Sequence, residues 1–203
     1  MKLIIVSGFL GSGKTTFLLG LAKRLAGEDG LDFVILENEA GEVSIDGSYL
    51  VGQGLRVREL FSGCVCCQLA GDLVVSMREI KADLDPAGVI LEASGLARVE
   101  SILDTLGKYY RELEAPLVIS LADLERSELY LEVPMPFVIN QLKHADIVLL
   151  NKADRGDTGL LEATENRLRE INPRAEVVRV SALDGTNLDV AAERVRAWML
   201  RTS

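Results

Sequence analysis

Residues 7–16 read Ser-Gly-Phe-Leu-Gly-Ser-Gly-Lys-Thr-Thr. They follow an apolar run at residues 3–6, which predicts a buried strand, and lead into residues 16–26, whose apolar spacing predicts a helix. This is the GxxxxGK[ST] pattern in the strand-to-helix setting of a phosphate-binding loop. A glycine-rich turn without a ligand is disfavoured, because every fixed position of the pattern is present in this setting.

The loop predicts a binding site for a nucleoside triphosphate. Its glycines let backbone N–H groups point inward, and the helix N-terminus adds a partial positive charge. We expect the Lys14 ammonium to reach the outer phosphates and the Thr15 hydroxyl to coordinate Mg²⁺. The predicted phosphate-binding residues are Gly8, Gly11, Ser12, Gly13, Lys14, Thr15 and Thr16.

Composition narrows the class of protein. The 203 residues suit one domain, and 48% hydrophobic and 26% charged residues are ordinary for a globular protein. A net charge of −9 argues against a nucleic-acid partner, and no apolar run is long enough to cross a membrane. We therefore expect a cytoplasmic protein that binds neither nucleic acid nor a membrane.

Apolar, β-branched runs alternate with amphipathic segments along the chain. Runs that predict strands lie at residues 3–6, 33–36, 88–91, 117–121, 147–150 and 177–180. Segments that predict helices lie at residues 16–26, 72–84, 99–113, 137–144, 160–171 and 190–200. This alternation predicts a doubly wound, three-layer α/β domain with a mostly parallel sheet. Ligands of such sheets bind at the carboxyl ends of the strands, where the motifs should converge.

A guanine motif is predicted where the strand at residues 147–150 ends. The sequence there is Asn151-Lys152-Ala153-Asp154. The Asp154 carboxylate can accept from N1–H and N2–H₂ of guanine, groups that adenine lacks, and Asn151 can face the O6/N7 side. Ser181 and Ala182 fit a further backbone contact to the base. The motif favours GTP over ATP, although an Asn-Lys-x-Asp sequence alone can be a simple turn.

Two acidic segments follow predicted strands. Glu37, Glu39 and Glu42 could hold Mg²⁺, orient water or bind another cation, or they could form a solvated loop. Glu92 ends a strand that resembles a Walker-B segment and could take the outer shell of Mg²⁺. The N–H of Gly95 could approach the γ-phosphate, so that this loop responds to hydrolysis. An ordinary strand end is the alternative.

All three cysteines, Cys64, Cys66 and Cys67, lie within four positions. Thiolates select Zn²⁺ and other soft or borderline ions, and three of them leave one tetrahedral position open. An open position suits a metal that is handed on. A structural zinc site, a redox centre or buried inert cysteines are the alternatives.

The motifs together resemble those of the CobW-like P-loop GTPases, relatives of the HypB and UreG metallochaperones. The resemblance rests on the stretches at residues 8–16, 37–46, 62–73, 91–97 and 151–154, and thus spans nearly the whole chain. It implies a slow GTPase that couples hydrolysis to delivery of Zn²⁺ or Co²⁺ to a client metalloprotein. It also implies that Cys64, Cys66 and Cys67 carry the transition metal and that a nucleotide-dependent homodimer can form.

The resemblance further implies that Lys14 and Thr15 serve the phosphates and Mg²⁺, with Glu37, Glu39 and Glu92 around the metal and the γ-phosphate. Lys14, Glu37, Glu92 and Gly95 are therefore the candidate catalytic residues. We expect residues 1–203 to form one GTPase domain without the C-terminal domain that is common in the family, as a minimal member or as a fragment.

Two other functions fit the same motifs. One is a GTP-dependent regulator or reactivator of a metalloenzyme or corrinoid enzyme, in which the cysteines hold a structural zinc. The other is a non-enzymatic metal-sensing module with a mainly architectural GTP pocket. The response of the metal site to the nucleotide distinguishes them from a metallochaperone.

Overall fold

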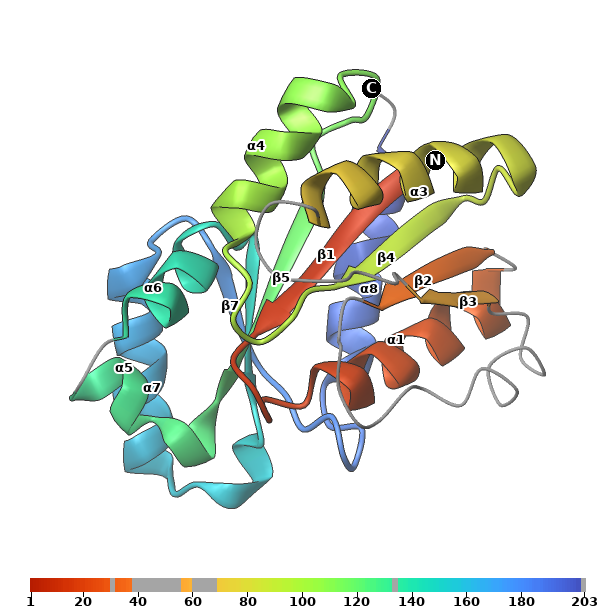
Figure 1. Ribbon diagram of the computed structural model, residues 1–203. Helices are drawn as coiled ribbons and strands as arrows, with labels where there is room; N and C mark the ends of the chain where they lie inside the picture. Colours follow the sequence, from red (N-terminus) through yellow and green to blue (C-terminus); the bar gives the residue numbers. More distant parts are fainter. Residues whose placement is uncertain (30–31, 38–55, 60–68, 133–134, 202–203) are drawn as a thin grey trace.

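The computed structural model describes residues 1–29, 32–37, 56–59, 69–132 and 135–201. Its centre is a seven-stranded sheet with the strand order β3-β2-β4-β1-β5-β6-β7, in which every neighbouring pair is parallel. The strands are β1 (Lys2–Gly8), β2 (Phe33–Glu37), β3 (Arg56–Glu59), β4 (Gly88–Glu92), β5 (Leu117–Asp123), β6 (Ile147–Asn151) and β7 (Glu176–Arg179). β1 lies between β4 and β5 (Figure 1).

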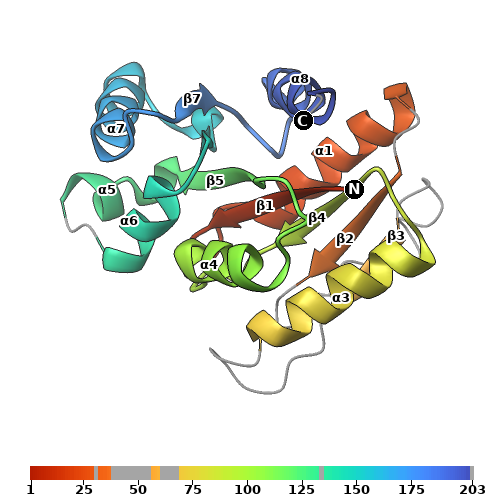
Figure 2. The ribbon, with the colours of Figure 1, turned by 90° about the horizontal axis from the view of Figure 1, so that it is seen from above.

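Helices cover both faces of the sheet. They are α1 (Lys14–Asp29), α3 (Leu69–Asp83), α4 (Val99–Tyr109), α5 (Glu128–Leu131), α6 (Pro136–Lys143), α7 (Thr158–Ile171) and α8 (Leu188–Met199). Two 3₁₀ turns, η1 (Leu124–Arg126) and η2 (Ala153–Arg155), follow β5 and β6. Figure 2 shows α1 and α8 on one side of the sheet and α3 and α4 on the other. The predicted doubly wound α/β fold is confirmed.

Successive side chains of the buried strands point to opposite faces of the sheet, so the core has two layers. In β1, Leu3 and Ile5 pack with the core beneath α3, α4, α6 and α7, whereas Ile4 and Val6 pack with the core beneath α1 and α8. All four side chains are at most 1% exposed. Because both faces of the strand are covered, β1 is apolar at every position in this run.

The strand at the β3 edge was not among the six predicted. It has only four residues, Arg56–Glu59, and its sequence Arg-Val-Arg-Glu lacks the apolar run that marks the other strands. The β3 backbone pairs with β2 in register, with Val34 opposite Arg56. An edge strand needs no apolar residues on both faces, so hydrophobic pattern alone does not identify it.

Helix α4 ends four residues earlier than the predicted boundary at residue 113. Tyr110 leaves the helical conformation with φ −135° and ψ 60°, while its N–H still donates to the Leu106 carbonyl. This places the Tyr110 side chain in the core, where it is 6% exposed, and Tyr109 remains on the surface. Burial of one aromatic ring thus ends the helix.

In the part of the chain that the structure describes, no helix combines the length and apolar character needed to span a membrane.

Candidate nucleotide-binding site

The phosphate loop connects β1 directly to α1 (Figure 1). Gly8, Gly11 and Gly13 have φ values of +145°, +77° and +91°, in the region that favours glycine. The loop is closed by a hydrogen bond from the Ser12 N–H to the Phe9 carbonyl (3.1 Å). Lys14 is the first residue of the 16-residue helix α1 and is 5% exposed. The arrangement places a cation and a helix N-terminus at the end of β1, as an anion site requires.

At two of these glycines, Gly8 and Gly13, neighbouring atoms leave no space for a side chain. A Cβ atom on Gly13 would lie 2.4 Å from Nδ2 of Asn151, and one on Gly8 would lie 2.7 Å from the Leu121 carbonyl oxygen. Neither distance leaves room for a side chain. The loop is therefore held against β5 and β6, the strands on one side of β1.

On the other side of β1, Thr15 meets the end of β4. Its hydroxyl donates a 2.8 Å hydrogen bond to Oε1 of Glu92, which is 3% exposed. Glu37, at the end of β2, is paired in register with Glu92. Hydroxyl and carboxylate oxygens are the ligands that Mg²⁺ prefers, so these residues fit a magnesium site beside the phosphate loop.

The loop after β4 lies against the phosphate loop. A Cβ atom on Gly95 would lie 2.7 Å from the backbone nitrogen of Leu10. From α6, the buried Gln141 side chain donates through Nε2 to the carbonyls of Gly95 and Ala97, both at 3.1 Å. The segment expected to respond to the γ-phosphate thus touches the phosphate loop and is fixed from α6.

Asn151 joins the phosphate loop to the guanine motif. Its Nδ2 donates to the Ser12 carbonyl (2.7 Å), and its Oδ1 accepts from the Ala182 N–H (2.9 Å). The side chain is 2% exposed. Both ends of the amide therefore serve to hold the loops after β1, β6 and β7 together, whereas the sequence suggested that Asn151 faces the base.

Lys152 has a left-handed backbone conformation, with φ 61°, that is costly for a residue with a side chain. Its ammonium donates to Oδ2 of Asp123 (2.8 Å) and to Oε2 of Glu125 (2.9 Å). Arg155 also donates to Glu125, at 2.9 Å. These ion pairs define a base-side network of Asp123, Glu125, Lys152 and Arg155.

The charges of the base-side network reinforce one another. Hydrogen bonds from Lys152 and Arg155 lower the pKa of Glu125 below its usual range. Burial alone would lower the pKa of Lys152, but its hydrogen bonds to Asp123 and Glu125 outweigh burial and raise the pKa overall. Glu125 and Lys152 therefore stabilise each other's charged forms.

The other predicted base contacts lie beside this network. Asp154 belongs to η2, and its carboxylate is 3.8 Å from Nε of Arg155 and about one-third exposed (32%). Ser181 and Ala182 follow β7, and both are buried. The Asp154 carboxylate and the buried loop after β7 lie at the same edge of the sheet, since they follow the carboxyl ends of the neighbouring strands β6 and β7.

Several predicted site residues lie outside the described residues. They are Glu39, Glu42, Cys64, Cys66 and Cys67. Among the residues that are described, no group of three or more His, Cys, Asp or Glu side chains is placed to hold a metal ion. The proposed cysteine site therefore rests on its sequence motif.

Three residues of the site were not predicted. Asp123 is the last residue of β5, which was expected to end at residue 121. A carboxylate at the end of an apolar run is a pattern from which this residue could have been predicted. Gln141 lies between Val138 and Leu142 on the buried side of α6, where a polar residue is unusual. Arg126, which donates to the Leu10 carbonyl (2.7 Å), carried no comparable signal.

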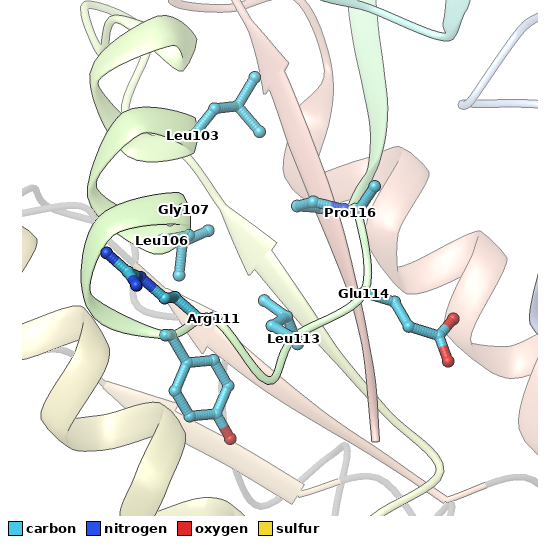
Figure 3. A pocket seen from close by; sticks show the side chains of 9 residues that line it. Leu103, Leu106, Gly107, Arg111, Leu113, Glu114 and Pro116 are labelled. Carbon is cyan, nitrogen blue, oxygen red and sulfur yellow. The ribbon is translucent and has the colours of Figure 1, made fainter. Parts of the chain in front are cut away.

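A hollow of about 230 Å³ lies away from this site. Figure 3 shows it between the end of α4 and the start of β5, with Leu106, Leu113 and Pro116 among its lining residues. This is the amino-terminal edge of the parallel sheet, opposite the phosphate loop. The hollow is thus separate from the loops that carry the predicted nucleotide contacts.

The sequence is similar to two zinc chaperones of Escherichia coli K12. It is 36% identical to the zinc chaperone YeiR over 155 residues, which cover 74% of this chain and 46% of YeiR. It is 30% identical to the zinc chaperone YjiA over 187 residues, which cover 87% of this chain and 56% of YjiA. The chain thus spans about half the length of these relatives.

The fold has a close counterpart among solved structures. The nickel complex of HypB from Helicobacter pylori superposes with a TM-score of 0.71 at 20% identity, covering 97% of this chain and 87% of HypB. Residues 2–179 match the family model described as the CobW/HypB/UreG nucleotide-binding domain. The chain belongs to the CobW/HypB/UreG family.

Proposed function

We propose that this chain binds Mg²⁺ and GTP and hydrolyses GTP slowly. The observation that carries the proposal is the hydrogen-bonded link through Asn151, which joins the phosphate loop to the guanine motif and to the loop after β7. In this scheme Lys14 binds the outer phosphates and Asp154 selects guanine. Family membership supports the proposal, because these residues lie within the matched nucleotide-binding domain.

Thr15 and Glu92 would hold Mg²⁺, with Glu37 beside them. The metal would neutralise charge on the phosphates, which is its general contribution to phosphoryl transfer. Gly95 would offer its N–H to the γ-phosphate while Gln141 holds the Gly95 carbonyl. The described residues include no imidazole at this site to act as a base, because His144 lies at the end of α6. This agrees with slow turnover.

We further propose that Cys64, Cys66 and Cys67 bind Zn²⁺ or Co²⁺, as the cargo of a metallochaperone in the cytoplasm. Support comes from the zinc-chaperone relatives and from thiolate chemistry, which selects these ions and requires a reducing compartment. Glu37 ends β2 and lies opposite Glu59 at the end of β3, the strand that precedes the cysteine motif in the sequence. In this scheme, a change at Glu37 on hydrolysis would reach the cysteine motif through the pairing of β2 with β3.

The test is a Co²⁺ titration of the reduced protein, read by thiolate charge-transfer absorption. We expect binding with Mg²⁺ and a non-hydrolysable GTP analogue to be at least about tenfold tighter than with Mg²⁺ and GDP. The control is the variant Cys64→Ser/Cys66→Ser/Cys67→Ser, which should lose the absorption while still binding GTP. Equal Co²⁺ affinity in both nucleotide states would contradict the delivery function and favour a structural or sensory site.

The client metalloprotein and a nucleotide-dependent homodimer are parts of the same proposal. Sedimentation with the GTP analogue and with GDP tests the dimer, which we expect only with the analogue. A monomer in both states would remove the dimer from the scheme and leave GTP binding unaffected.

A further inference from the structure

Arg126 contacts three consecutive residues of the phosphate loop although it lies outside the motif. Its Nη1 donates to the Leu10 carbonyl (2.7 Å), and its Cζ lies 5.6 Å from the centre of the Phe9 ring. A Cβ atom on Gly11 would lie 3.3 Å from Nη2. The guanidinium therefore lies against Phe9, Leu10 and Gly11, which we call the loop tip.

The position of Arg126 is itself fixed by a buried carboxylate. Nε of Arg126 lies 3.8 Å from Oδ2 of Asp123, and the Asp123 side chain is only 1% exposed. The same oxygen accepts from Lys152 at 2.8 Å. Asp123 thus connects the cation on the loop tip with the base-side network.

The loop tip also contacts the segment after β4. Gly95 packs against the backbone nitrogen of Leu10, while Arg126 binds the carbonyl of the same residue. Leu10 is thus held from both sides of β1. In the proposed GTP complex the Gly95 N–H contacts the third phosphate, which would therefore lie close to Leu10.

We propose that Arg126 is a positioning residue that selects GTP over GDP by fixing the loop tip and placing positive charge beside the third phosphate. The inference rests on the proposed binding of GTP. Because Arg126 holds the Leu10 carbonyl, it also fixes the peptide groups of the loop tip before the nucleotide binds, and a preorganised N–H donor costs no rearrangement. GDP lacks the phosphate nearest the tip and should gain less from this arrangement.

The test compares GTP and GDP affinities of the wild type and Arg126→Gln, by displacement of a fluorescent guanine nucleotide. We expect Arg126→Gln to weaken GTP binding about tenfold, as loss of a partly exposed charged contact would, and GDP binding no more than about twofold. Arg126→Lys keeps the charge without the planar guanidinium and should restore part of the GTP preference. Arg194→Gln, which removes an exposed charge paired with Glu176 at the opposite edge of the sheet, should change neither affinity.

An equal loss of GTP and GDP affinity would overturn the inference, because it would show only a general loosening of the loop. Unchanged affinities in Arg126→Gln would overturn it as well. If Arg126→Gln does not fold, an Arg126→Lys variant that fully keeps or equally loses both affinities overturns it in the same way. Failure of the wild type to bind either nucleotide would instead refute the proposed GTP binding, so the two claims fail separately.

Discussion

The two halves of the candidate site are built by different means. The phosphate half, from Gly8 to Thr15, depends on backbone geometry: three glycines with positive φ and a helix that begins at Lys14. The base half depends on side chains, chiefly the network of Asp123, Glu125, Lys152 and Arg155 around a strained Lys152 backbone. A cradle made of backbone can bind phosphate whatever the base, whereas discrimination between bases needs side chains held at fixed positions.

The two halves meet at the contact between Gly13 and Asn151. Gly13→Ala should therefore have the largest effect, because its Cβ would overlap Nδ2 of Asn151 and the residue has φ +91°. We expect a loss of about 3 kcal/mol in the free energy of unfolding and no detectable GTP binding. Chemical denaturation and nucleotide titration measure both.

Gly107→Ala is the matched control for that substitution. Gly107 lies in α4, and nothing is within 4 Å of a Cβ atom there. This variant should gain about 0.5 kcal/mol of stability from helix propensity and bind GTP normally. If Gly13→Ala behaved like Gly107→Ala, the proposed contact between the halves would be wrong.

Asp154→Asn should change the base half of the site and leave the phosphate half intact. The amide no longer accepts from both N1–H and N2–H₂ of guanine, so we expect GTP affinity to fall about 100-fold. The amide N–H₂ can donate to the O2 of xanthine, so XTP should bind more tightly than GTP. Isothermal titration with GTP and XTP tests this, and equal losses for both nucleotides would show that Asp154 does not read the base.

Asn151→Ala should weaken the contact between the halves without changing specificity. It leaves the buried Ser12 carbonyl and Ala182 N–H without their partner, at a cost of about 2 kcal/mol in stability. Affinities for GTP and GDP should fall together, by about tenfold. A selective loss of GTP alone would mean that Asn151 acts on the third phosphate and not on the contact between the loops.

The smallest effect concerns the charge of Glu125. Because its pKa is lowered in the folded protein, its contribution to stability is complete above the ordinary value of 4.5 and is lost as the pH falls through the lowered pKa. The difference in unfolding free energy between wild type and Glu125→Gln should thus be constant from about pH 6 to 8 and shrink in acid. A difference that grows in acid would refute this role of the network.

The contrast between the halves also explains what could be predicted from the sequence. The buried strands and the glycine-rich loop between β1 and α1 were predicted correctly, because continuous apolar runs and glycine spacing determine their local conformation. The edge strand β3 and the end of α4 at Tyr110 were not, because pairing and ring burial decide them. Asp123, Arg126 and Gln141 act through contacts between residues far apart in the chain, such as the 116 positions between Arg126 and Leu10, which no local pattern records.

Competition between GTP, GDP and ATP for the site tests the account most directly. The wild-type protein with Mg²⁺ and a fluorescent guanine nucleotide is titrated with each competitor in turn. The account predicts displacement by GTP and GDP and at least about 100-fold weaker displacement by ATP, because adenine has no donors for Asp154. Equal displacement by ATP and GTP would contradict it, since the base half would then not distinguish guanine from adenine.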